Sequence, residues 1–251
     1  MSQRKPLMAG NWKMYKTPEQ TAEFFAKFLP LVAGAKHADV LICPPFVNLA
    51  AAIEAAKGSA VAVGGQNCFW EKEGAYTGEI SAPMLKAAGA SAVLIGHSER
   101  RQYFGETDAT VLKRTQAALA AGLLPVVCVG ERLEEREANR TEAVLATQFG
   151  NGIAELSAED FARIVVAYEP VWAIGTGKVA TPEMAADAHR ALRSLAAERY
   201  GNPAAQKLRI LYGGSVKPDN VKGLMAQPEI DGTLVGGASL DAAGFASIVN
   251  F

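Results

Sequence analysis

The stretch Ile164-Val165-Val166-Ala167-Tyr168-Glu169-Pro170 decides the fold, because it joins an unbroken apolar run to an acidic residue and a proline. A run without polar alternation is typical of a parallel strand that is covered on both faces. Pro170 favours an extended backbone at Glu169 and ends the strand there. The stretch therefore predicts a buried parallel strand that carries a carboxylate at its carboxyl end.

Seven more apolar runs of this kind recur along the chain at intervals of roughly thirty residues, the size of a βαβ unit. They cover residues 7–9, 40–43, 60–63, 93–95, 126–129, 208–211 and 234–235. Segments with helical spacing of apolar residues lie between them, for example 25–32 and 185–195. Thr17-Pro18-Glu19-Gln20 and Thr181-Pro182-Glu183 have the N-cap threonine and first-turn proline of helix starts. The sequence thus predicts eight strand–helix units.

Eight such units without a linker in 251 residues match a single closed (β/α)8 TIM barrel domain spanning residues 1–251, an α/β fold. An open doubly wound sheet is the alternative. The polar residues at strand ends favour the barrel, on the premise that they share one site. In an open sheet the first and last of eight strands would lie about 30 Å apart, whereas all strand ends surround one barrel mouth. The residues at the strand ends that would share this site are Asn11, Lys13, His97, Glu99, Glu169, Ser215, Gly236 and Gly237.

The composition excludes several classes of protein. With 49% hydrophobic and 20% charged residues, the chain is not disordered, collagen-like or disulfide-rich. A formal charge of −1 excludes a global positive field for nucleic acid or an anionic membrane. Cys43, Cys68 and Cys128 are far apart and odd in number, which predicts reduced thiols. Because no signal-peptide core or membrane-spanning run occurs, we expect a cytoplasmic protein.

Of the three histidines, only His97 directly follows a strand and precedes charged residues, so it is the candidate for chemistry. His37, in a polar turn, and His189, on an alanine-rich helix, are expected to be solvated. Residues 96–100 resemble the serine-hydrolase elbow G-x-S-x-G, but Arg100 replaces the final glycine. Ser98 is therefore predicted to be structural, with a hydrolase as an alternative function and a non-catalytic binding scaffold as another.

Glycine-bearing turns follow the last two strands, at residues 213–215 and 236–239. Barrels commonly bind phosphate at this place through backbone N–H groups. With Lys13 to supply positive charge, the turns predict a small phosphorylated substrate. Residues 175–180 match the dinucleotide pattern G-x-G-x-x-A, but five residues separate them from the strand, which disfavours a nucleotide cofactor. No spacing of metal ligands occurs, so we expect neither a metal nor another cofactor.

Five motifs, in order along the whole chain, resemble those of the triosephosphate isomerase family. They are Asn11-Trp12-Lys13-Met14, Gly96-His97-Ser98-Glu99-Arg100-Arg101, residues 168–178, Tyr212-Gly213-Gly214-Ser215-Val216, and residues 234–240. Tyr15 departs from the family, which more often has a small polar residue there. The resemblance implies a metal-independent isomerase of glycolysis and gluconeogenesis. Its reaction would interconvert dihydroxyacetone phosphate and D-glyceraldehyde 3-phosphate through an enediolate.

The resemblance also implies a role for each candidate residue. Glu169 would be the base, His97 a neutral electrophile, and Lys13 and Asn11 the groups that stabilise the oxyanion, while Glu99 would have a supporting role. The substrate-binding residues would be Asn11, Lys13, Gly175, Ser215, Gly236, Gly237 and Leu234. We further hypothesise that Ile174 and Leu234 enclose Glu169 in an apolar slot.

Two loops complete the expectations. The segment after Glu169 is apolar in its middle and has proline on one side and small residues on the other, which is typical of a lid. This lid consists of Pro170, Val171, Trp172, Ala173, Ile174, Gly175, Thr176, Gly177 and Lys178. The second loop begins with Gln66, ends with Gly78 and contains three aromatic residues that need a covering partner. The resemblance places Thr77 of this loop beside a neighbouring subunit's site, which predicts a homodimer.

Overall fold

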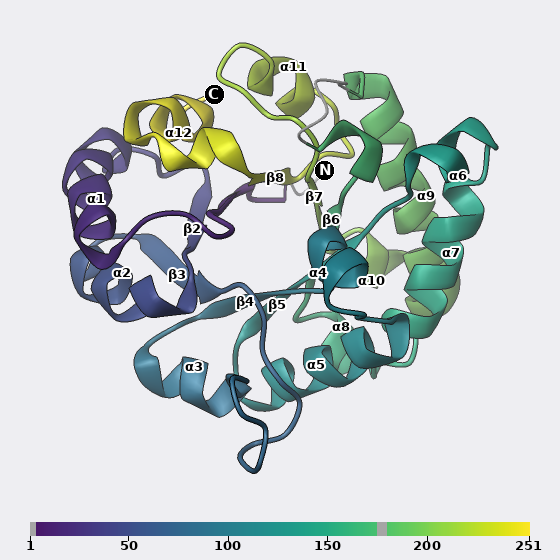
Figure 1. Cartoon of the computed structure of the whole chain (residues 1–251). Helices are drawn as coiled ribbons and strands as arrows, with labels where there is room; N and C mark the ends of the chain where they lie inside the picture. Colours follow the sequence, from purple (N-terminus) through teal and green to yellow (C-terminus); the bar gives the residue numbers. More distant parts are fainter. Residues whose placement is uncertain (1–3, 175–179) are drawn as a thin grey trace.

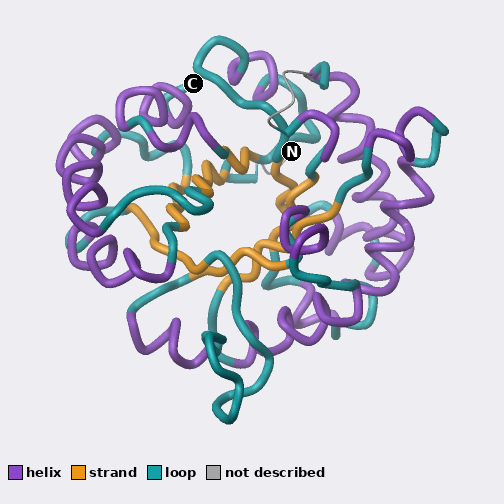
Figure 2. Tube along the Cα trace, in the orientation of Figure 1, coloured by secondary structure: helices purple, strands orange, loops and turns teal. Residues whose placement is uncertain are grey.

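The computed structural model describes residues 4–174 and 180–251, which form a closed parallel barrel surrounded by helices (Figures 1 and 2). The strands are β1 (Leu7–Asn11), β2 (Asp39–Cys43), β3 (Val61–Gly65), β4 (Ala92–Ile95), β5 (Leu124–Val129), β6 (Val165–Tyr168), β7 (Arg209–Tyr212) and β8 (Gly232–Val235). Each pairs with its neighbour in chain order, and β1 pairs with both β2 and β8. Because β1 and β8 close the ring, the barrel prediction is confirmed and the open-sheet alternative is wrong.

Most of the helices form an outer ring in Figure 1, whereas α4 lies inside this ring, next to the strands. The helices and 3-10 turns are α1 (Pro18–Val32), η1 (Phe46–Asn48), α2 (Leu49–Ala56), α3 (Ala82–Ala88), α4 (Ser98–Tyr103), α5 (Asp108–Ala120), α6 (Leu133–Glu137), α7 (Thr141–Gly152), α8 (Ala158–Phe161), η2 (Val171–Ala173), α9 (Pro182–Tyr200), α10 (Asn202–Ala205), α11 (Val221–Met225), η3 (Gly237–Leu240) and α12 (Ala242–Val249). The threonine caps predicted from sequence are present: Thr17 accepts a hydrogen bond from Gln20 N, and Thr181 accepts one from Met184 N. Among the described residues, no helix is both long and apolar enough to cross a membrane.

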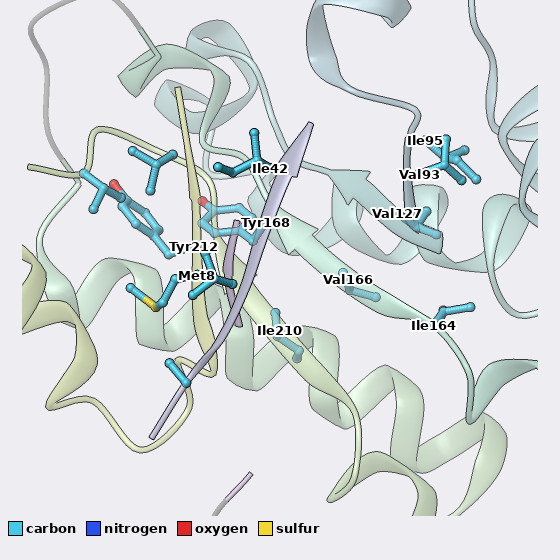
Figure 3. Close-up of a cluster of buried hydrophobic side chains, with 14 of the residues drawn as sticks. Met8, Ile42, Val93, Ile95, Val127, Ile164, Val166, Tyr168, Ile210 and Tyr212 are labelled. Atoms are coloured by element: carbon cyan, nitrogen blue, oxygen red, sulfur yellow. The ribbon is translucent and has the colours of Figure 1, made fainter. Parts of the chain in front are cut away.

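The strands are buried on both faces, and alternate residues belong to two separate apolar clusters. The outer cluster combines strand residues with helix residues, and Figure 3 shows part of it, including Val93, Val127, Val166 and Ile210. The inner cluster is built from the intervening strand residues, among which alanine and cysteine alternate with larger side chains. The double burial explains why the strands appear in the sequence as continuous apolar runs.

Ion pairs tie the amino ends of several strands together. Asp231, just before β8, accepts hydrogen bonds from Arg193 Nη2 at 2.8 Å and from the backbone N of Ile210 in β7 at 2.9 Å. Arg4, which precedes β1, also contacts Asp231. Arg209 in β7 pairs with Asp39 in β2 at 2.8 Å. This end of the barrel therefore holds charged contacts that link strands far apart in the sequence.

The two remaining histidines differ from each other. His37 is exposed, as expected, with Nε2 3.0 Å from the carbonyl oxygen of Val249. The prediction for His189 is wrong, because its ring is fully buried and Nδ1 lies 3.0 Å from the carbonyl oxygen of Glu229. The ring lies on the inward face of α9 and makes an edge contact with Tyr168. The neighbours of His189 in the sequence, Ala188 and Arg190, do not indicate its contact with Glu229.

The three cysteines are free thiols, and all three are buried. Burial raises the pKa of Cys68 to about 12 and raises those of Cys43 and Cys128 as well. All three side chains therefore remain protonated at neutral pH and serve as small apolar groups in the packing.

Candidate active site

Glu169 and His97 meet at the carboxyl ends of β6 and β4. Glu169 Oε1 lies 2.9 Å from His97 Nε2, and the backbone N of Ser98 donates to Glu169 Oε2 at 2.9 Å. The Glu169 residue is 2% exposed and the His97 residue is 6% exposed, so their contact is shielded from water. Two residues that are 72 positions apart in the chain thus place a carboxylate against an imidazole.

The hydrogen bonds of His97 define its tautomer. The backbone N of Glu99 donates to His97 Nδ1 at 3.2 Å, so Nδ1 acts as an acceptor and carries no proton in this contact. Nε2 then carries the hydrogen and donates a hydrogen bond to Glu169 Oε1. His97 is also the N-cap of α4, which fixes the ring relative to the backbone that follows. The ring therefore directs its Nε2 toward Glu169 at the barrel mouth.

The two groups shift each other's pKa. Burial raises the pKa of Glu169, but the neighbouring imidazole, the Ser98 N–H and Lys13 lower it by more, so its pKa lies below the usual value. Burial lowers the pKa of His97, but the carboxylates of Glu169 and Glu99 raise it by more. Both net shifts thus depend on the direct contact between the two side chains.

Asn11 is the last residue of β1, and Lys13 lies two positions after it. Lys13 Nζ is 2.6 Å from Glu99 Oε1, and Lys13 N donates to Asn11 Oδ1 at 2.9 Å. The Lys13 backbone has φ of +51°, a left-handed conformation that residues other than glycine rarely adopt. Asn11 is buried, whereas Lys13 and Glu99 are partly exposed at the mouth. Glu99 therefore contacts both the lysine and the segment that contains His97.

The glycine turns after β7 and β8 lie at the same rim. A Cβ added at Gly236 would lie 3.5 Å from Lys13 Cε, so this turn adjoins the lysine, and Gly237 begins η3. Asn220 Nδ2 donates to the Ser215 carbonyl at 3.0 Å and holds the turn after β7. Leu234, in β8, is buried in the inner cluster. The fourth predicted phosphate-binding residue, Gly175, lies outside the described residues.

The first half of the predicted lid is anchored by a buried acid that the sequence analysis missed. Glu131 Oε1 accepts from Trp172 Nε1 at 2.9 Å and from the Tyr168 hydroxyl at 3.1 Å, and its carbonyl oxygen accepts from Val171 N. Pro170 leads into η2, and Ile174 is half-buried at its end. The predicted lid residues Gly175, Thr176, Gly177 and Lys178 lie outside the described part. The position of Glu131 two residues after an apolar strand was the signal available in the sequence.

Two glycines leave room for Glu169. A Cβ at Gly130 would lie 1.7 Å from the Glu169 carbonyl oxygen, and one at Gly213 would lie 2.9 Å from Glu169 Cγ. The Gly213 N also donates to the Tyr168 carbonyl at 2.7 Å. The backbones after β5 and β7 therefore confine Glu169 from both sides.

The loop of residues 66–78 extends away from the barrel below β3 in Figure 1. Its aromatic rings pack on one another: Phe69 lies 4.0 Å from Trp70 and 4.6 Å from Tyr76 between ring centroids. Thr77 and most of the loop tip are exposed. Across residues 4–174 and 180–251, no three side chains of the metal-binding types gather into a site.

Comparisons with known proteins agree with this geometry. The family model described as "Triosephosphate isomerase" matches residues 6–251. The triosephosphate isomerase of Solibacter usitatus is 68% identical over 248 residues, covering 99% of this chain and all of that protein. That of Citrifermentans bemidjiense is 54% identical, covering 99% of each. The crystal structure of triosephosphate isomerase from Bartonella henselae superposes with a TM-score of 0.88 at 41% identity, covering 98% of each chain. This chain belongs to the triosephosphate isomerase family.

Proposed function

We propose that this chain catalyses the reaction of its family, the interconversion of dihydroxyacetone phosphate and D-glyceraldehyde 3-phosphate, with Glu169 as the base and His97 as the electrophile. The 2.9 Å contact between Glu169 Oε1 and His97 Nε2 carries this proposal. A carboxylate and an N–H donor that meet at one point can act on adjacent atoms of a small substrate. Glu169 removes a proton from one carbon and returns it to the next, while His97 donates a hydrogen bond to the carbonyl oxygen.

Substrate entry changes the acid–base properties of this pair. A substrate bound between Glu169 and His97 separates the two groups, so each loses the main partner that opposes the effect of burial. Without the imidazole beside it, burial raises the pKa of Glu169 and makes it a stronger base. Without the carboxylate beside it, burial lowers the pKa of His97 and keeps the ring neutral. The substrate thereby produces the protonation states that the reaction requires.

Lys13 and Asn11 supply the remaining polar groups for the enediolate. The Lys13 ammonium places a positive charge where the substrate oxygen gains negative charge, and loss of such a donor costs on the order of 3 kcal/mol in the barrier. Glu99, 2.6 Å from Lys13 Nζ, holds this ammonium at the mouth before substrate binds. Backbone N–H groups of Gly175, Ser215, Gly236 and Gly237 bind the phosphate.

The lid of residues 170–178 closes over the bound substrate and excludes water, which suppresses loss of phosphate from the enediolate. Ile174 from the lid and Leu234 from β8 enclose Glu169 in an apolar slot. Burial of Leu234 at 2% exposure supports this arrangement. The Glu131–Trp172 hydrogen bond anchors the first part of the lid before closure.

We also propose that residues 1–251 form one domain, that two chains assemble into a homodimer, and that the protein works in the cytoplasm. The loop of residues 66–78 supports the dimer, because Tyr76 in this loop exposes 45% of its surface to solvent. The loop would place Thr77 near the partner's site. Analytical ultracentrifugation at assay concentration tests this, and a fully active monomer would contradict the dimer.

Deuterium labelling tests the reaction itself. We expect the protein, incubated with dihydroxyacetone phosphate in heavy water and chelator, to introduce carbon-bound deuterium that mass spectrometry detects. The Glu169→Gln variant, which lacks a base at the same position, is expected to lose this labelling. If labelling is absent and a serine-directed acylating probe reacts at Ser98, the protein is a hydrolase. If labelling is absent and the probe does not react, the protein is a binding scaffold.

A further inference from the structure

We infer that Gln66 is a positioning residue for Lys13, holding the strained backbone from which the lysine side chain reaches the substrate. This inference rests on the proposed function, because it concerns how one of its residues is placed. Gln66 directly follows β3 and contacts the segment after β1 that contains Lys13.

The conformation of Lys13 needs an external cause. Its φ of +51° costs a residue with a side chain on the order of 1–3 kcal/mol, so neighbouring groups must hold it. One hold is local, the hydrogen bond from Lys13 N to Asn11 Oδ1. That bond fixes the amide before the strained residue but leaves the carbonyl after it free to turn.

Gln66 holds that carbonyl. Its Nε2 donates to the Lys13 carbonyl oxygen at 2.8 Å and to the Cys43 carbonyl oxygen at 2.9 Å. Both partners are acceptors, so only the NH2 end of the side chain fits between them, and its two hydrogens are both used. The Cys43 oxygen also accepts from Trp12 N at 3.1 Å, which ties the same point to the residue before Lys13.

The direction of the Lys13 side chain depends on this backbone. Lys13 Nζ reaches Glu99 Oε1 at 2.6 Å, and its Cε passes the Gly236 turn. Relaxation of the strained φ would turn the Lys13 carbonyl and side chain together about the N–Cα bond, and this would move the ammonium away from both. Loss of the Gln66 amide would leave two carbonyl oxygens without that donor and allow such a rotation, which moves a charge away from the phosphate and the substrate oxygen.

A double-mutant cycle tests whether Gln66 acts through Lys13. The probe is glycerol 3-phosphate, which has the phosphate monoester of the substrate but no carbonyl, so calorimetry measures binding without turnover. We expect Gln66→Met to weaken binding at least tenfold with Lys13 present and less than twofold in a Lys13→Ala background. Gln116→Met, on the exposed face of α5, is the matched control and is expected to bind normally. An equal loss in both backgrounds, or no loss with Lys13 present, would overturn the inference.

Gln66→Glu gives a second test that does not depend on the methionine variant folding. An ionised carboxylate cannot donate to either carbonyl, whereas a protonated one can donate to one of them. We therefore compare the association constant of the variant for glycerol 3-phosphate with that of the unmodified protein at the same pH. The ratio of the two constants is expected to rise several-fold as the pH falls from 8 to 5. A ratio that stays constant with pH would contradict the inference. Deuterium labelling by the unmodified protein distinguishes failure of this inference from failure of the proposed function.

Discussion

Lowering the pH from 8 to 5 is expected to remove about 2 kcal/mol of unfolding free energy through His189 alone. The ring is fully buried, and its Nε2 has no hydrogen-bond partner among the described residues. Burial lowers the pKa of His189 from 6.5 to about 3, with Arg193 adding to the effect and the contact with the Glu229 carbonyl opposing it. The folded ring therefore stays neutral at a pH where the unfolded ring is protonated.

The size of the effect follows from the two pKa values. Because the unfolded chain binds a proton below about pH 6.5, this contribution to stability is complete above that pH and decreases as the pH falls. At pH 5 the loss is about 2 kcal/mol, and it holds for any folded pKa well below 5. Near pH 3 the loss is about 4 kcal/mol, because the folded ring begins to bind a proton there as well.

Urea unfolding at fixed protein concentration measures this loss. His189→Gln keeps an amide donor for the Glu229 carbonyl but does not titrate, so its unfolding free energy should fall by about 2 kcal/mol less than that of the unmodified protein between pH 8 and 5. Gln116→Met replaces an exposed residue that does not titrate and should follow the unmodified protein. Parallel pH profiles for the His189→Gln variant and the unmodified protein would refute the reasoning.

Three further changes test the site. Glu169→Asp withdraws the carboxylate by about 1 Å and should lower turnover on the order of 10²-fold in a coupled isomerase assay; near-normal turnover would remove Glu169 from the mechanism. Gly213→Ala places a Cβ 2.9 Å from Glu169 Cγ and should lower kcat about tenfold or more with an unchanged circular dichroism spectrum. Gly34→Ala is its control, since a Cβ there meets nothing within 4 Å, and equal kcat values for the two variants would argue against steric confinement of Glu169. Leu234→Ala should cost about 2–5 kcal/mol of stability and shift the pH profile of kcat/KM, and an unchanged kcat and profile would rule out the apolar slot.

Much of the barrel could be predicted from sequence because its information is local. Eight apolar runs, each followed by polar or glycine residues, locate the strands and their carboxyl ends. The Glu169-Pro170 pair marks the end of β6, and the threonine caps mark the starts of α1 and α9. Each of these signals depends on neighbours within a few positions, so a single sequence is enough to read it.

The features that could not be predicted depend on contacts between distant segments. Gln66 Nε2 reaches a carbonyl 53 positions earlier, and no spacing rule links a loop glutamine to a left-handed lysine. Glu131 meets Trp172 only because β5 and β6 are neighbours in the barrel. His189 is buried against the Glu229 carbonyl, which lies 40 positions later in the chain, and no local pattern shows that contact.

The charged contacts at the amino ends of the strands have a consequence for how this protein can evolve. Two ion pairs, Arg193–Asp231 and Arg209–Asp39, connect segments at the amino ends of the strands. The reactive groups lie at the opposite, carboxyl ends. The loops at the carboxyl ends can therefore change in length and sequence to bind another ligand, while the contacts at the amino ends keep the barrel closed. Substitutions at the carboxyl ends of the strands can thus alter the chemistry during evolution without loss of the fold, because the amino ends stabilise it separately.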